Sequence, residues 1–276
     1  MARGVERRPR FAVIFTGVFF VLLYLPIAIV ILFSFNSERS LSTFGGFSMQ
    51  WYSDFLNDEA LLESLRASLL IASVAAVGSL VLGTMLAMAL ERVRSRGGRL
   101  AGTVALLPLV TPDVVAGVAA LLLFTGVGIS LSLNTVIIAE ITFSIAYVTV
   151  IVRGRLASIS DEVEEAGRDL GCTPWQAVRL VTLPAIMPAL VAAGLLVFAL
   201  VFDDFVLAFF TTGVDPQPLP VRIYSSIRFG VSPAINAVGT VMLLVSGLVL
   251  LASLFVPRLF GRRESGLSTL TTGDGR

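Results

Sequence analysis

The chain has 276 residues, of which 56% are hydrophobic and 14% are charged. A soluble protein of this size carries roughly 25% charged residues, so the composition indicates a membrane protein. The net charge of +1 gives no reason to expect a nucleic-acid partner. Histidine is absent and Cys172 is the single cysteine, which excludes an internal disulfide, a His-ligated metal and Ser-His or Cys-His catalytic pairs. We therefore expect no metal, no cofactor and no enzymatic activity in this chain.

The first apolar run is long enough to cross a membrane. It covers residues 11–35 and follows four arginines, whereas about 20 residues cross a ~30 Å hydrocarbon core. Its length, with no small-residue cleavage site after it, distinguishes it from a signal peptide. The next segment, 36–63, is acidic and contains Trp51 and Tyr52, which suit a membrane interface. We expect this segment outside.

A second span is expected at 64–90, and it carries a stripe of small residues. The stripe consists of Ala72, Ala76, Ser79, Gly83 and Ala87. Small residues at spacings of three and four let another helix approach closely. Four arginines between 92 and 99 follow, and the positive-inside rule places them in the cytoplasm.

Four more spans are expected, at 100–124, 135–152, 189–210 and 234–256. Prolines at 108 and 112 break the first of these, and a short amphipathic stretch at 221–229 precedes the last. Six spans with both termini in the cytoplasm place every arginine cluster inside. The sequence thus predicts an all-α integral membrane protein with a cytoplasmic N-terminus (1–10), a transmembrane domain (11–258) and a cytoplasmic tail (259–276).

A polar segment, 161–188, joins the fourth and fifth spans and has the pattern of two short helices. Asp161 suits the start of the first helix, and Gly171 suits a left-handed residue at its end. Thr173 and Gln176 form a capping box that starts the second helix, with proline at its first position. After the arginines at 153 and 155, this loop lies in the cytoplasm.

This loop resembles the EAA loop of ABC importer permeases, whose pattern is Glu-Ala-Ala, three residues, Gly, nine residues, Ile-x-Leu-Pro. Gly167 replaces the second alanine and Val181 replaces the isoleucine. The resemblance implies a type I ABC importer permease fold and a coupling loop, 153–188, that inserts into a cleft on the ATPase subunit. It assigns coupling to Glu165, Ala166, Gly167, Gly171, Leu183 and Pro184. The Leu183–Pro184 pair is expected to close the second helix, and an ordinary helical hairpin is the alternative.

Four acidic residues fall within the expected spans: Asp113, Glu140, Asp203 and Asp204. A charge at the bilayer centre costs roughly 2.5 to 3.5 kcal/mol, so these side chains should face a protein interior or a water-filled path. At ~1.5 Å per residue, Asp113, Glu140 and Asp203 lie at one level, about 18 to 20 Å from the cytoplasmic side. No basic residue is expected at this depth.

These acids predict a pathway for cations, with Phe143, Tyr147 or Phe202 available for cation–π contact. The candidate path residues are Asp113, Asp203, Asp204, Glu140 and Tyr147. Two other interpretations stay open. Asp204 or Glu140 caps a broken helix, or is protonated and only structural.

A second resemblance covers nearly the whole chain, from about residue 20 to 256. It rests on LYLPIAIVILFSFN (23–36), Trp51-Tyr52, Thr111-Pro112-Asp113, Asp203-Asp204, and the run from Leu219-Pro220 to Asn236-Ala237. These features are similar to one of the two permease subunits of spermidine/putrescine importers.

That resemblance implies a polyamine substrate and a multi-pass protein of the cell inner membrane. The implied partners, besides the lipid bilayer, are a second homologous permease, two ABC ATPase subunits and an external substrate-binding protein. ATP would be bound and hydrolysed by the ATPases, because this chain has no GxxxxGK[ST] motif. An importer for ferric iron, an amino acid or thiamine is the alternative. A cation channel or a proton-coupled carrier also stays open.

Overall fold

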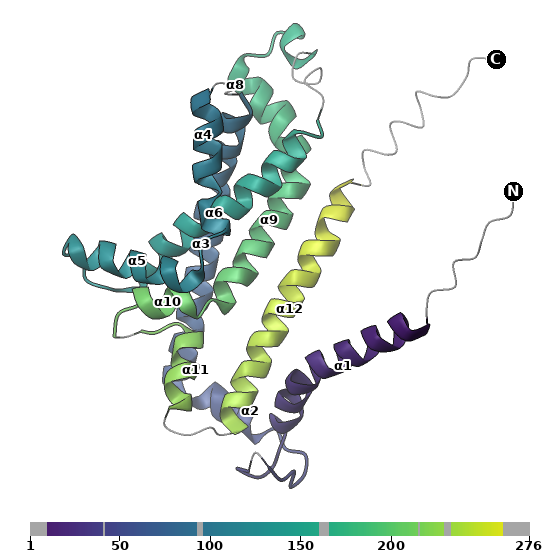
Figure 1. Ribbon diagram of the computed structural model, residues 1–276, viewed down its shortest axis with the longest axis vertical. Coiled ribbons are helices and arrows are strands. Elements are labelled where there is room, and N and C mark those ends of the chain that lie inside the picture. Colours follow the sequence, from purple (N-terminus) through teal and green to yellow (C-terminus); the bar gives the residue numbers. More distant parts are fainter. Residues whose placement is uncertain are drawn as a thin grey trace, which may run out of the picture. The chain divides into compact units, whose positions relative to one another are not determined.

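The computed structural model describes residues 10–40, 42–92, 96–159, 166–214, 216–228 and 233–261, and these are almost entirely helical (Figure 1). The helices are α1 Arg10–Phe33, α2 Gln50–Asn57, α3 Glu59–Arg92, α4 Arg96–Ala105, α5 Asp113–Gly126, α6 Leu133–Leu156, α8 Pro174–Ala177, α9 Leu183–Asp203, α10 Val206–Thr211, α11 Leu219–Ile227 and α12 Pro233–Gly261. A 3₁₀ turn, η1 (Leu107–Leu109), and a π-helical turn, η2 (Val178–Thr182), complete them. The only β pairing in the described part is an isolated bridge between Asn36 and Phe47. The predicted all-α class is confirmed.

Among the described residues, five helical stretches are long and apolar enough to cross a membrane, and a sixth is present if a bent pair counts as one span. They correspond to the six predicted spans. Most of the predicted cytoplasmic ends, 1–9 and 262–276, lies outside the described residues.

The described residues form two compact units. The first consists of residues within 1–62 and 223–243. In it, Asn36 is fully buried and organises the loop between α1 and α2. Its side chain donates to the carbonyl oxygens of Ser40 and Thr43, both at 2.8 Å, and accepts from the Gly45 amide. The Trp51 indole donates to the Asn36 carbonyl at 2.6 Å, which fixes α2 to this loop.

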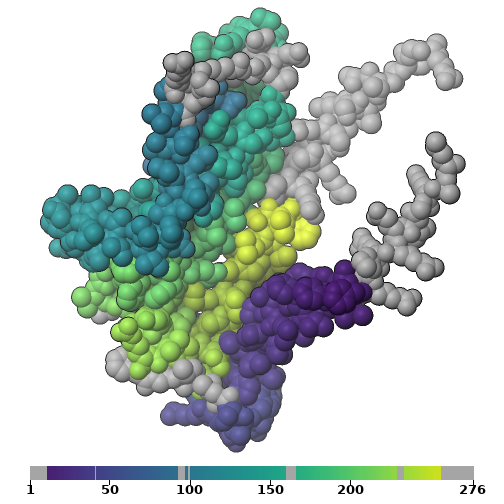
Figure 2. Space-filling model, viewed as in Figure 1, coloured from purple at the N-terminus to yellow at the C-terminus, as the bar shows by residue number. Residues whose placement is uncertain are grey.

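Within that unit, α1 is apolar on every side. None of its most hydrophobic window is buried, and its surface is visible in Figure 2. Phe11 and Val13 near its start are 80% and 58% exposed. A helix that is apolar all round belongs in lipid or against another protein.

The second unit consists of residues within 63–222 and 244–276, and the small residues of α3 let α6 approach closely there. A Cβ added at Gly83 would lie 2.7 Å from Val148 Cβ on α6. Thr149 on α6 donates its hydroxyl to the Gly83 carbonyl at 3.3 Å, and Ser79 donates to the Ile141 carbonyl at 3.4 Å. The close approach that the stripe predicts is confirmed, with α6 as the partner.

The third predicted span is sharply bent. The stretch ending in η1 and helix α5 meet at 105°, with Pro108 inside η1 and Pro112 directly before α5. The predicted break is confirmed. Residues 100–124 are therefore a broken segment and not one continuous helix, because the proline at 112 cannot continue the preceding hydrogen-bond pattern.

The fifth predicted span, 189–210, is wrong at both ends. Helical structure runs from Pro174 through the π-helical turn η2 and α9 to Asp203, then breaks before α10. Pro184 therefore does not close a helix. The wider turn directly before it relieves the clash of a proline ring with the carbonyl four residues earlier, so the helix continues.

The polar loop before this helix has the predicted hairpin form where it is described. Asp161 and Glu165 lie outside the described residues. Gly171 has φ +89°, and the Cys172 amide donates to the Gly167 carbonyl at 3.2 Å, which is the predicted left-handed end of the first helix. The Thr173 amide donates to the Gln176 side chain at 2.8 Å, and the Gln176 amide donates back to Thr173 Oγ1 at 3.4 Å. The predicted capping box is confirmed.

Candidate functional site

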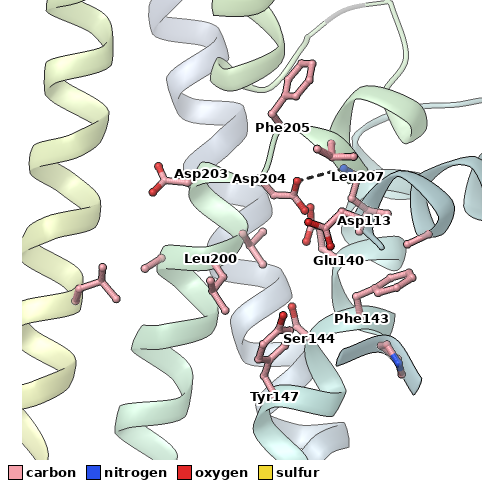
Figure 3. Close-up of a pocket in the computed structure, with 16 residues that line it drawn as sticks. Asp113, Glu140, Phe143, Ser144, Tyr147, Leu200, Asp203, Asp204, Phe205 and Leu207 are labelled. Atoms are coloured by element: carbon pink, nitrogen blue, oxygen red, sulfur yellow. Dashed lines mark hydrogen bonds between the residues drawn. The ribbon is translucent and has the colours of Figure 1, made fainter. Parts of the chain in front are cut away.

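A cavity of about 430 Å³ lies within the second unit. Side chains from α5, α6, α9 and the α9–α10 junction line it (Figure 3). All five predicted path residues are among them: Asp113, Glu140, Tyr147, Asp203 and Asp204. The described residues that line it include no arginine.

Asp113 reaches the cavity because the chain breaks immediately before it. Pro112 is the N-cap of α5 and Asp113 is its first residue. The Thr111 hydroxyl donates to the Leu107 carbonyl at 2.8 Å and stabilises the preceding turn. An acidic residue in the first turn of a helix is favourably placed relative to the helix dipole.

Asp204 lies at the second break. It follows α9 with an extended backbone (φ −69°, ψ 115°), and its Oδ1 accepts a hydrogen bond from the Leu207 amide at 3.2 Å. Asp204 thus caps α10. This agrees with the open interpretation that Asp204 caps a broken helix. The same side chain is directed toward Asp113 and Glu140 (Figure 3), so the cap and the acidic cluster share one residue.

Glu140 lies in the middle of α6, away from any helix end. It is 3% exposed, and its Oε1 has no hydrogen-bond partner among the described residues. The cap interpretation is therefore wrong for Glu140. Glu140, Phe143, Ser144 and Tyr147 recur at helical spacing, so one face of α6 lines the cavity.

Asp203 differs from the other three acids. It lines the cavity, but its side chain points away from the cluster (Figure 3). Sequence spacing placed Asp113, Glu140 and Asp203 together. The structure instead gathers Asp113, Glu140 and Asp204, because the chain turns between α9 and α10.

Two aromatic residues also differ from expectation. Phe202 is fully buried and stacks on Phe198 with ring centroids 6.0 Å apart, so it is not available in the cavity. Phe205, which follows the break at Asp204, also lines the cavity and was missed. Phe143 and Tyr147 line the cavity, as expected of cation–π partners.

The wall that carries the cluster is held firmly. The Thr135 hydroxyl of α6 donates to the Thr211 carbonyl at the end of α10, at 2.7 Å. Leu207 of α10 packs with Ala116, Phe124 and Ala139 in a buried apolar cluster. These contacts fix α10, and with it Asp204, against α5 and α6.

Three carboxyl groups so close together need a compensating positive charge or a proton. Glu140 interacts electrostatically with both Asp113 and Asp204. Like charges in a buried site repel, and burial makes each ionised form costly. Either a proton held between these carboxyl groups or a bound cation would compensate the charge.

The predicted coupling residues lie far from this cavity along the chain. Ala166, Gly167 and Gly171 belong to the hairpin, and Leu183 and Pro184 begin α9. Gly167 packs against Val181, since an added Cβ would lie 3.2 Å from Val181 Cγ2. The two residues that depart from the EAA pattern, Gly167 and Val181, are therefore in contact. Helix α9 connects this end to Asp203 over 21 residues, or about 30 Å at ~1.5 Å per residue.

Comparison with known proteins gives one family and close relatives. Residues 79–265 match the family described as "Binding-protein-dependent transport system inner membrane component". The putrescine transport system permease protein PotI of Escherichia coli (strain K12) is 38% identical over 253 residues, covering 89% of each chain. The spermidine/putrescine transport system permease protein PotC of the same strain is 36% identical over 244 residues, covering 88% of this chain and 92% of the relative.

Solved structures share the fold at low sequence identity. A chain of a bacterial ABC transporter involved in the import of the acidic polysaccharide alginate superposes with a TM-score of 0.72 at 15% identity, covering 90% of this chain and 94% of its own. A chain of the MetNI methionine ABC transporter, in an inward-facing conformation, gives 0.63 at 20% identity, covering 72% and 95%. The helical arrangement is therefore that of ABC transporter membrane subunits.

Proposed function

Because the chain belongs to the family of binding-protein-dependent transport system inner membrane components, we propose that it is the polyamine-conducting permease subunit of an ATP-driven importer. Two relatives of more than 35% identity are permeases for putrescine or for spermidine and putrescine. The family does not define the solute. The acidic cavity supports the assignment to polyamines.

The single observation that carries this assignment is the cluster of Asp113, Glu140 and Asp204 with no arginine lining the cavity. A polyamine is a flexible chain with two or three ammonium groups separated by methylene groups. Its ammonium ends suit carboxylates, and its methylene segments suit apolar walls such as Leu200 and Ala199. An anionic solute would meet only repulsion here.

Coupling to ATP would run through the hairpin and α9. In this proposal the hairpin, with Glu165 to Pro184, inserts into an ATPase subunit, which binds and hydrolyses ATP. The uninterrupted helical path from Pro174 to Asp203 supports it, since movement at one end is transmitted to the other. Arg155 on α6 donates to the Ala185 carbonyl on α9 at 3.1 Å, which links the end of α6 to the start of α9.

The proposed assembly contains this chain, a second homologous permease, two ATPase subunits and an external binding protein. The chain would cross the cell inner membrane six times with both termini in the cytoplasm. Residues 11–258 form the membrane domain, including the coupling loop 153–188, between the ends 1–10 and 259–276. The arginine clusters that follow the second, fourth and sixth spans support this orientation.

Labelling of Cys172 tests the orientation. In sealed cells a membrane-impermeant maleimide is expected to leave Cys172 unmodified, and permeabilised cells are expected to be labelled, because the hairpin faces the cytoplasm. Cys172 is the only cysteine of the chain and is partly exposed, so label found on the chain after purification has one source. Labelling of intact cells would place the hairpin outside and contradict the coupling proposal.

Uptake by carboxylate variants tests the solute pathway. In vesicles that contain the assembled transporter, Asp113→Asn and Asp204→Asn are each expected to lower spermidine and putrescine uptake about tenfold or more. A charge-assisted hydrogen bond contributes about 1.5 to 3 kcal/mol, which sets this magnitude. Asparagine also serves as an N-cap, so Asp204→Asn removes the charge and keeps the α10 cap.

Asp203→Asn is the matched comparison, because its side chain points away from the cluster; a smaller loss is expected. Unchanged affinity and rate in both cluster variants would contradict the cation pathway. A wild-type transporter that accumulates no polyamine would contradict the assignment of polyamines as the solute, but not the family membership. Uptake that persists with an ATPase-dead partner would favour a channel.

A further inference from the structure

The face of α6 that lines the cavity carries polar or aromatic side chains at three successive depths. Glu140 belongs to the acidic cluster, Ser144 lies one helical turn further along, and Tyr147 lies two turns along (Figure 3). At ~1.5 Å per residue, Ser144 is about 6 Å and Tyr147 about 10 Å from Glu140 along the axis. These values are the axial spacings of the three backbone positions from which the side chains extend.

A linear triamine has a matching spacing. Each bond of an extended methylene chain advances roughly 1.2 Å, as follows from C–C and C–N bond lengths. Two ammonium groups separated by four carbons are therefore about 6 Å apart, and the third ammonium of a triamine lies about 11 Å from the first. A diamine of four carbons reaches from Glu140 to Ser144. Only a triamine also reaches Tyr147.

The chemistry of the far position differs from that of the cluster. Tyr147 is 38% exposed and lines the cavity. An aromatic face attracts an ammonium group within about 6 Å of the ring centroid. Leu200 on α9 and Phe143 on α6 also line the cavity, and their apolar surfaces suit the methylene chain.

We propose, resting on the polyamine function above, that the Tyr147 ring contacts the distal ammonium of a triamine and so determines selectivity by chain length. The near ammonium is held by Asp113, Glu140 and Asp204, and Ser144 accepts a hydrogen bond from the next amino group. Spermidine uses all three positions. Putrescine uses the first two, so its passage does not depend on Tyr147.

The test compares the two solutes in one assembly. The complete transporter is reconstituted in vesicles, its binding protein is saturated with spermidine or putrescine in turn, and uptake is measured for wild type, Tyr147→Leu, Tyr147→Phe and Ser144→Ala. Saturation removes the contribution of the binding protein's own preference. Thermal unfolding in detergent checks that each variant is folded.

Tyr147→Leu is expected to lower the ratio of spermidine to putrescine uptake about threefold to tenfold, the range of a partly desolvated cation–π contact. Tyr147→Phe keeps the ring and is expected to keep the ratio. Ser144→Ala is expected to slow both solutes to a similar extent and leave the ratio unchanged.

Several outcomes would overturn the inference. Equal losses for both solutes in Tyr147→Leu, no loss for either, or a ratio in Tyr147→Phe as low as in Tyr147→Leu contradict the ring contact. A wild type that transports putrescine but not spermidine also contradicts it and leaves the polyamine function intact. A wild type that transports neither contradicts the polyamine function itself.

Discussion

Gly83→Ala is expected to destabilise the protein by about 1 to 3 kcal/mol, the usual cost of overpacking a close helix contact. The added methyl group would lie 2.7 Å from Val148 Cβ and 3.0 Å from the Ile145 carbonyl oxygen. The second of these is backbone, so the side chains cannot relieve the clash by rotating. Helices α3 and α6 must separate, and the hydrogen bond from Thr149 to the Gly83 carbonyl is strained.

Thermal unfolding of the purified complex in detergent measures this effect, and uptake measures its consequence for the cavity face of α6. Gly154→Ala is the matched control on α6, because nothing lies within 4 Å of a Cβ added there. Alanine is the better helix former by up to about 1 kcal/mol, so the control is expected to be neutral or stabilising. An unfolding temperature in Gly83→Ala equal to that of Gly154→Ala would refute the close contact.

Gly171→Val is expected to abolish coupling, with at least a tenfold loss of uptake, while the protein remains folded. Gly171 has φ +89°, a conformation that a β-branched residue adopts only at a cost of about 1 to 2 kcal/mol. The residue is exposed and has open space around it, so the substitution strains only the break between the two helices of the hairpin. In the proposed assembly, a hairpin of altered shape would no longer fit the ATPase subunit.

Gly171→Asn separates the conformational effect from simple loss of glycine, because asparagine tolerates the left-handed region. It is expected to retain most of the uptake. Uptake and ATP hydrolysis, measured together in the reconstituted assembly, check both variants. Equal uptake by the valine and asparagine variants would show that the left-handed turn has no part in coupling.

Local signals in the sequence were enough for the hairpin. Gly171 as a left-handed helix end and the Thr173–Gln176 capping box are both present in the structure, since each depends on residues within a few positions of one another. Pro184 was misread for the opposite reason. A proline normally ends a helix, and only the formation of a π-helical turn over Val178–Thr182 lets this one continue.

The assumption of regular helix geometry led to a wrong prediction for the third acid of the cluster. Counting residues along uninterrupted spans put Asp203 beside Asp113 and Glu140, but α9 ends at Asp203 and Asp204 turns toward the cluster. No local sequence pattern predicts that break. It depends on the packing of α10 against α5 and α6, through Leu207 and through the hydrogen bond from Thr135 to Thr211.

By itself the sequence determined that this chain is a helical membrane protein with intramembrane acids and a capped polar hairpin. These properties follow from composition, from the length of apolar runs and from short-range hydrogen bonds. Only the tertiary structure decided that α6 is the helix that packs on the α3 stripe and that Asp204 completes the acidic cluster. It also decided that Phe202 is buried and not available in the cavity. Those outcomes depend on contacts between residues far apart in the chain. The bend at Pro112 and the break at Asp204 set the directions of the helices that make these contacts.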